Sequence, residues 1–187
     1  GWYQNEQAQS SCKPCPAGSV CATSGVDVPP PCGAGSFSAS QASSCSTCEV
    51  GYYQNQQGQE SCIECKVGSF QNATGQASCF VCSEGSSQDL TGQTSCNLCV
   101  PGTYQNEVGQ DVCQECNAGY YQAETGQASC DQICPMGQYS IAGSAGCQIC
   151  AASTYNDAVG SGSCSACPVG EQLWNRYIIA LRLYTYI

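Results

Sequence analysis

Cysteines recur along this chain at a constant interval of 17 residues. The members of this series are Cys45, Cys62, Cys79, Cys96, Cys113, Cys130, Cys147 and Cys164. A second series follows three residues behind it, with one member displaced by a residue: Cys48, Cys65, Cys82, Cys99, Cys116, Cys134, Cys150 and Cys167. A period this regular indicates a tandem array in which each unit is a Cys-x2-Cys pair followed by a 13-residue arm.

The composition indicates what these cysteines do. Ile, Leu, Val and Phe make up only about 14% of the 187 residues, a fraction typical of chains that cannot build a hydrophobic core. With 20 cysteines, the chain instead has the density at which disulfides replace such a core. We therefore predict a small disulfide-rich fold in an oxidising compartment, which is the extracellular space or the cell surface.

Each arm has the pattern of a β-hairpin. Between Cys48 and Cys62 the order is Gly51, a variable residue, the aromatic Tyr53, polar residues, then Gly58-Gln59 before the return to cysteine. A short extended run, a turn with Asn and Gly, and a short return predict a hairpin with a loop of about 3–5 residues. The expected fold is thus a series of β-hairpin repeats, either an elongated solenoid or a string of modules, in which each unit contacts only its neighbours.

The hairpin interpretation suggests a disulfide pattern, in which the second cysteine of each pair bonds the first cysteine of the next. It leaves Cys12 and Cys167 unpaired, and we expect a further Cys15–Cys21 bond. The predicted pairs are Cys32–Cys45, Cys48–Cys62, Cys65–Cys79, Cys82–Cys96, Cys99–Cys113, Cys116–Cys130, Cys134–Cys147 and Cys150–Cys164. A crossed pattern, with Cys45–Cys62 and Cys48–Cys65, is the alternative, because sequence alone does not determine connectivity.

Four segments follow from the register of the repeats. Residues 1–14 are the end of a truncated repeat, 15–44 are irregular Pro-containing repeats, 45–170 are the regular repeats, and 171–187 are a non-repeat tail. The tail carries both arginines and no cysteine, and it is too short and too charged for a membrane span. An interface strand, a membrane-proximal segment and an artefact of a misassigned gene end are all open for it, and we expect membrane attachment only through regions outside this chain.

Enzymatic and metal chemistry are not expected. Cys-x2-Cys pairs resemble zinc-ribbon spacing, but uninterrupted tandem repetition without any histidine favours disulfides. A redox-active Cys-x2-Cys needs a βαβ context that this sequence lacks. Ser-His-Asp and Cys-His arrangements cannot be assembled, because the chain has no histidine and the repeats hold only Lys13 and Lys66. No catalytic residue, cofactor or metal is therefore assigned. The net charge of −10 argues against nucleic acid as a partner.

One aromatic residue occupies the same position in most arms, and we interpret these residues as the small hydrophobic centre of each module, packed on the disulfides. They are Tyr3, Phe37, Tyr53, Phe70, Tyr104, Tyr121, Tyr139 and Tyr155. The alternative is a stacking series for ligand rings. Tyr52 and Tyr120, beside them, are better candidates for exposed contacts, and Asn72-Ala73-Thr74 is a glycosylation sequon in a predicted turn.

The stretch of residues 48–65, Cys-Glu-Val-Gly-Tyr-Tyr-Gln-Asn-Gln-Gln-Gly-Gln-Glu-Ser-Cys-Ile-Glu-Cys, resembles the ephrin-receptor-like cysteine-rich repeat, of the growth-factor-receptor cysteine-rich superfamily. The resemblance extends over about residues 1–170. It implies a module found in receptor ectodomains, secreted proteins and protist surface proteins. The expected function is an extracellular spacer, a stalk or coat segment of a cell-surface or secreted protein that mediates extension and protein interaction or adhesion. A ligand-binding ectodomain fragment of a cell-surface receptor is the alternative. Expected partners are proteins or glycans at the cell surface, with self-association as a further option.

Overall fold

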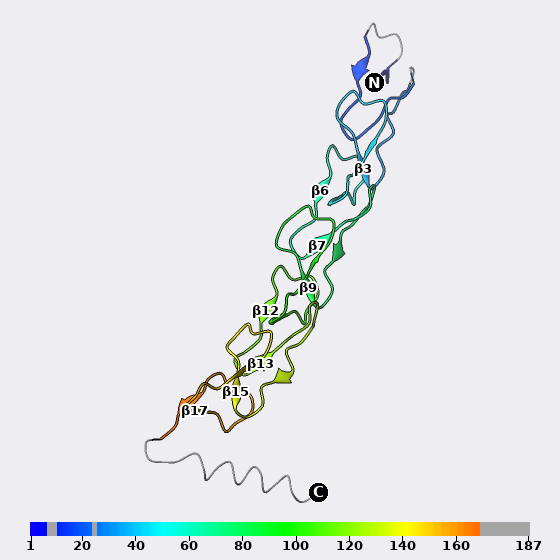
Figure 1. Ribbon diagram of the computed structural model, residues 1–187. Coiled ribbons are helices and arrows are strands. Elements are labelled where there is room, and N and C mark those ends of the chain that lie inside the picture. The colour runs from blue at the N-terminus through cyan, green and yellow to red at the C-terminus, as the bar shows by residue number, and fades with distance from the viewer. Residues whose placement is uncertain (7–10, 24–25, 169–187) are drawn as a thin grey trace, which may run out of the picture.

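The computed structural model describes residues 1–6, 11–23 and 26–168, and these form a row of nine antiparallel β-hairpins (Figure 1). Every strand has two residues. In chain order the paired strands are β1 (Trp2–Tyr3) with β2 (Lys13–Pro14), β3 (Ser36–Phe37) with β4 (Ser46–Thr47), β5 (Tyr52–Tyr53) with β6 (Ile63–Glu64), β7 (Ser69–Phe70) with β8 (Phe80–Val81), β9 (Ser86–Ser87) with β10 (Asn97–Leu98), β11 (Thr103–Tyr104) with β12 (Gln114–Glu115), β13 (Tyr120–Tyr121) with β14 (Gln132–Ile133), β15 (Gln138–Tyr139) with β16 (Gln148–Ile149), and β17 (Thr154–Tyr155) with β18 (Ser165–Ala166).

The register places the framework aromatic opposite the residue that follows the first cysteine of the next pair, as in Tyr53 opposite Ile63. In the segment before β3, an isolated bridge between Ser19 and Pro31 stands where the other repeats have a hairpin. Because a two-residue strand pair is not stable by itself, each hairpin depends on contacts with other repeats and, from β3–β4 onward, on its disulfide.

Backbone hydrogen bonds join each repeat to the next. Gly51 N–H donates to the carbonyl of Gln71 at 2.7 Å, and Gln54 N–H donates to the carbonyl of Gln76 at 3.1 Å. In the other direction, Gly75 N–H in the loop of the next repeat donates to the carbonyl of Cys48 at 2.8 Å. The same bonds recur along the array, so neighbouring repeats share one continuous backbone network.

Contacts also reach the second repeat along, which contradicts the expectation that a repeat touches only its neighbours. Thr91 Oγ1, in the loop between β9 and β10, donates to Glu64 Oε2 on β6 at 2.9 Å. At Gly51, a Cβ atom would lie far inside van der Waals contact with the backbone carbonyl of Gly92. The loops are long enough to extend past one repeat and to pack on the strand pair beyond it, and this could not be inferred from a linear repeat pattern.

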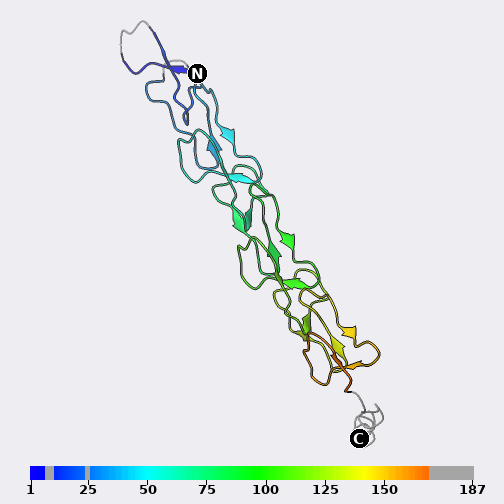
Figure 2. The same cartoon turned by 90° about the vertical axis from the view of Figure 1, so that its left-hand side faces the viewer.

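The result is an elongated rod in which the hairpins follow one another from the N-terminal end to β18 (Figures 1 and 2). The predicted fold class, disulfide-rich hairpin repeats with little hydrophobic core, is confirmed. Within the described residues, no helix has the length and apolar character needed to span a membrane.

Candidate functional site

The cysteines form one disulfide at the base of each of the eight hairpins from β3–β4 to β17–β18. The structure brings together all eight sequence-predicted pairs and also joins Cys15 to Cys21. Cys12 is free and exposed, and Cys167 is free and half-buried. The two cysteines of a Cys-x2-Cys pair therefore enter different disulfides and lock two successive hairpins, which is the geometry of a structural framework.

The interior of the array consists of cysteines, glycines and polar residues. Among the described residues, all the buried apolar side chains belong to cysteines, and the side chains buried beside them belong to serines and glutamines. This overturns the interpretation of the framework aromatics as the module centre, because every one of them is only half-buried. Because the strands have only two residues each and the interior is filled by cysteines, serines and glutamines, the aromatic ring lies partly on the surface of the hairpin.

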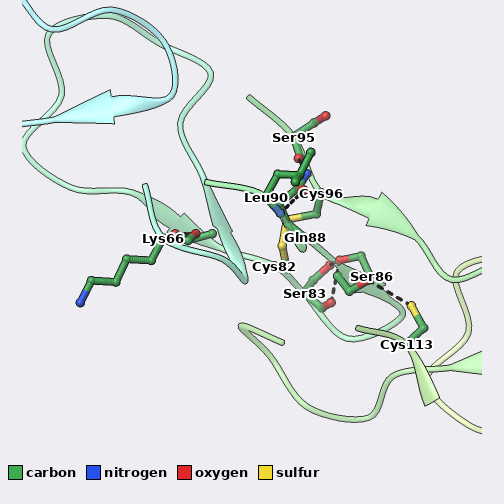
Figure 3. The surroundings of a disulfide bond; sticks show 11 residues. Lys66, Cys82, Ser83, Ser86, Gln88, Leu90, Ser95, Cys96 and Cys113 are labelled. Atoms are coloured by element: carbon green, nitrogen blue, oxygen red, sulfur yellow. Dashed lines mark hydrogen bonds between the residues drawn. A yellow bond between two sulfur atoms is a disulfide. The ribbon is translucent and has the colours of Figure 1, made fainter. Parts of the chain in front are cut away.

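A buried glutamine, which immediately follows the framework aromatic position, takes the central place. Gln88 is 3% exposed; its Nε2 donates to the carbonyl of Ser95 at 2.8 Å, and its Oε1 accepts from the N–H of Leu90 at 3.1 Å. Figure 3 shows these bonds beside the Cys82–Cys96 disulfide. One side chain thus satisfies a donor and an acceptor of its own loop, which would otherwise be costly to bury.

The same pair of bonds recurs at four other buried glutamines, Gln54, Gln71, Gln105 and Gln122, and at the half-buried Gln4. Sequence reasoning noted a Gln or Ser at this position but gave it no role, because a polar residue in a polar chain does not suggest burial. Its recurrence at a fixed place after the aromatic was the signal that could have identified it.

Two tyrosines at one position have different surroundings. Tyr52 donates to Glu64 Oε1 at 3.1 Å, and this hydrogen bond, followed by the negative charge of Glu64, raises the pKa of Tyr52. Tyr120 instead faces Ile133 across its hairpin and is 37% exposed. Of the two candidates for exposed contacts, Tyr120 is exposed, whereas Tyr52 is half-buried and bonds to Glu64, which is part of the link between second-neighbour repeats.

Two shallow hollows lie on the surface of the rod. One, of about 290 Å³, lies between the hairpins β11–β12 and β13–β14, and Tyr104, Asn106, Asn117 and Tyr120 line it. The other, also of about 290 Å³, is lined in part by Ser87, Asp89 and Asp111; Ser87 occupies a framework position that elsewhere carries an aromatic. The first hollow is neutral and aromatic, and the second combines two carboxylates with the apolar side chains of Leu98, Val100 and Val112.

The sequon lies where a glycan could be attached. Asn72 is exposed, in the loop between β7 and β8, and Ala73 and Thr74 beside it are also exposed. Glycosylation of Asn72 stays a prediction. The tail, residues 171–187, lies outside the described residues, and the four-segment division of the chain also stays a prediction.

Comparison with known proteins relates the chain to one family. The family model described as tyrosine-protein kinase ephrin type A/B receptor-like matches four segments, residues 35–66, 56–99, 102–140 and 137–174. These segments cover most of the array of hairpins. No curated protein matches the chain.

Proposed function

The chain belongs to the ephrin-receptor-like family of cysteine-rich repeats, and from this premise we propose that it serves as an extracellular spacer, a stalk or coat segment that holds other parts of a surface or secreted protein at a distance. The family is a non-catalytic, receptor-type ectodomain module, and nine disulfides suit an oxidising environment.

The observation that carries this proposal is the contact between second-neighbour repeats. A string of independent hairpins would bend at every junction. Here Gly75 N–H donates to the carbonyl of Cys48 in the adjacent repeat, while Thr91 donates to Glu64 two repeats away. A close backbone approach between second neighbours recurs along the array, as between Gly51 and Gly92 and between Gly68 and Gly109. A junction is therefore bridged by a neighbour contact and by a contact that passes over it, and both must break before the rod bends there.

Rod length tests the proposal. By the compact scaling law a globular chain of this size has a radius of gyration of about 16 Å. A five-residue strand spans ~17 Å, and each repeat is taken to advance the rod by a part of this, roughly 10 Å. A rod with this advance for each repeat has a radius of gyration of about 30 Å. Solution scattering should give the larger value.

Duplication of residues 65–98, which are two whole repeats, should add roughly 20 Å to the maximum dimension by the same estimate. When the chain is displayed between a membrane anchor and an epitope, the epitope should rise by the same increment. A duplicated chain with unchanged length, or a compact scattering profile for the parent chain, would exclude a spacer function.

A second role, as a ligand-binding ectodomain segment, is favoured by one specific feature. The hollow beside Tyr104 and Tyr120 is lined by two tyrosines and two asparagines, a set that the corresponding positions hold at no other junction in the sequence.

A further inference from the structure

The hollow between the hairpins β11–β12 and β13–β14 combines two aromatic rings with two side-chain amides. Tyr104 is half-buried, and its hydroxyl donates to Gln114 Oε1 at 3.2 Å, which fixes the ring on its hairpin. Tyr120 lies on β13 and is 37% exposed. Asn106 and Asn117 are exposed, and neither side-chain amide has a hydrogen-bond partner among the described residues.

The chemistry of this lining is complementary to a sugar. A tyrosine ring offers an apolar face, against which the C–H face of a pyranose can pack, and a polar edge. Each asparagine amide offers both donors and an acceptor, the combination that pairs with neighbouring hydroxyl groups. The volume of about 290 Å³ is close to the lower end, roughly 300 Å³, of small-molecule sites, so one or two sugar rings would fill it.

Charge narrows the ligand class further. From residue 67 to residue 168 the sequence holds eight Asp and Glu residues and no Lys or Arg. The hollow nonetheless has no charged residue in its lining, which includes Ala128 and Ser129 besides the four side chains above. An anionic ligand would be repelled by the surrounding field, and a cationic one would find no carboxylate in the hollow, so an uncharged ligand fits best.

The constellation occurs at one junction only. The repeat defines the four positions. Tyr104 is the framework aromatic, and Asn106 is the second residue after it. Asn117 follows Cys116, the second cysteine of the next pair, and Tyr120 follows Gly119. At the junction of residues 48–64 with 65–81, these positions hold Tyr53, Asn55, Lys66 and Ser69, so half of the set is present. The Ala-Ser-Cys segment that completes the lining is also repeated there, at 77–79.

We propose that Tyr104, Asn106, Asn117 and Tyr120 form a binding site for a neutral glycan, such as the uncharged disaccharide units of surface polysaccharides. This site goes beyond the spacer function and does not depend on it, because rod length and sugar binding are measured separately. Since the site is shallow and makes few contacts, we expect dissociation constants on the order of 1 mM for a disaccharide.

Titration of the whole chain, followed by NMR of backbone and asparagine side-chain amides, tests the proposal. The probes are lactose, cellobiose and N,N′-diacetylchitobiose, with sialyllactose as an anionic contrast and a Lys-Leu-Phe-rich peptide as a protein-like contrast. At least one neutral probe should shift the Asn106 and Asn117 amides and bind about tenfold more tightly than sialyllactose. Absence of shifts with all neutral probes, or saturable binding of the peptide alone, would overturn the proposal.

Variants give a loss and a gain of the site. Tyr120→Ala should weaken binding at least tenfold, and Tyr52→Ala, at the same position four repeats earlier along the array, should leave it unchanged. Lys66→Asn with Ser69→Tyr completes the set at the earlier junction and should raise the stoichiometry from one to two sites per chain. If Tyr120→Ala binds the sugar as the parent chain does, with an unchanged melting temperature and unchanged disulfides, the sugar binds elsewhere. If the double variant still binds one sugar per chain, these four residues are not sufficient to form the site.

Discussion

Two kinds of hairpin repeat differ by one residue in the loop, and the difference reveals what selects the residue that follows the framework aromatic. Where the disulfide spans 14 positions, this residue is a buried Gln in five repeats and the half-buried Asn156 in the sixth; where it spans 13, it is the buried Ser38 or Ser140. Gln54 binds the N–H of Gln56 two residues on, whereas Ser140 Oγ donates back to the carbonyl of Tyr120 in the preceding repeat at 2.9 Å.

A loop that is one residue shorter no longer has the arrangement of backbone groups that the glutamine side chain binds. From Gln54 to the turn glycine Gly58 there are four positions, but from Ser140 to Gly143 there are only three. In the shorter repeat the side chain turns toward the preceding repeat, where Ser38 Oγ likewise finds the carbonyl of Ser19 at 2.9 Å. Asn156 does both, since its Oδ1 accepts from Ala158 and its Nδ2 donates to the Gln138 carbonyl. The residue at this position is thus determined by the backbone groups that need a hydrogen-bond partner, and not by the apolar area that its side chain buries.

The largest expected effect concerns a feature that both kinds of repeat share. Gly102 has a positive φ of 86°, and a Cβ there would collide with the backbone carbonyl of Gly143, in a short loop; Gly51 meets Gly92, in a long loop, in the same way. Gly102→Ala and Gly51→Ala should each lower the local opening free energy by at least about 3 kcal/mol, since φ strain alone costs about 1–3 kcal/mol. Amide hydrogen exchange measures this.

Gly146→Ala is the matched control, because nothing lies within 4 Å of its added Cβ and its φ is not positive. It should change stability by no more than about 0.5 kcal/mol. A large difference between Gly51→Ala and Gly102→Ala would mean that the two loop lengths do not place their tips equivalently.

The next effect tests whether loop length acts through the disulfide. Cys99→Ser with Cys113→Ser should cost roughly 3 kcal/mol, as should Cys134→Ser with Cys147→Ser, because the closure entropy of the two loops differs very little. Because loops reach the second repeat, faster exchange should extend two repeats to either side of the lost bond and stop there.

Peptide mapping of the unmodified chain is the accompanying control, and it should recover Cys48–Cys62 and Cys82–Cys96 links. Cys45–Cys62 and Cys48–Cys65 links would establish the crossed pattern instead. Loss of protection along the entire chain in either double variant would mean that the repeats unfold as one cooperative unit.

A third prediction interconverts the two kinds of repeat. Gln54→Ser leaves the Ser61 carbonyl and the Gln56 N–H without their partner and should cost about 2–3 kcal/mol. Deletion of Gln56 in the same chain shortens the loop to three positions and allows the introduced serine hydroxyl to donate to the preceding repeat. The double change should therefore recover about 1 kcal/mol, roughly one hydrogen bond.

The exposed Gln57→Ser is the control for side-chain type and should be nearly neutral. If the deletion adds its own cost to that of Gln54→Ser without any recovery, loop length and residue type are independent, and the interpretation of the Ser repeats is wrong.

The sequence predicts the hairpins and their disulfides because both depend on local spacing. A period of 17 residues places two cysteines at the base of each arm, which favours their closure with one another over the crossed pattern, and Gly51 and Gly58 mark the turns. It does not predict the buried glutamines, because hydropathy rules assign Gln to the surface. The hollow at Tyr104 and Tyr120 was equally hidden, since its residues come from two repeats and converge only in three dimensions. The one partial signal was the exposed position assigned to Tyr120.

The smallest expected effect compares two long-loop repeats that differ in one cross-strand partner. Tyr52 faces Glu64, and Tyr120 faces Ile133. The hydrogen bond to Glu64, and then its charge, raise the pKa of Tyr52 above the ordinary value of 10.0. A raised folded-state pKa means that the unfolded chain loses this proton first, so the contribution to stability is complete below the ordinary pKa and is lost as the pH rises through the folded pKa.

In NMR of ring-labelled tyrosine, the Tyr52 signal should titrate at higher pH than in Glu64→Gln, which removes the charge and keeps the side-chain shape. Since Thr91 also donates to Glu64, that variant should speed exchange in the loop of residues 88–95 as well. An unshifted Tyr52 titration would mean that the hydrogen bond does not persist in solution, and unchanged exchange at Thr91 would remove this side-chain link between second-neighbour repeats.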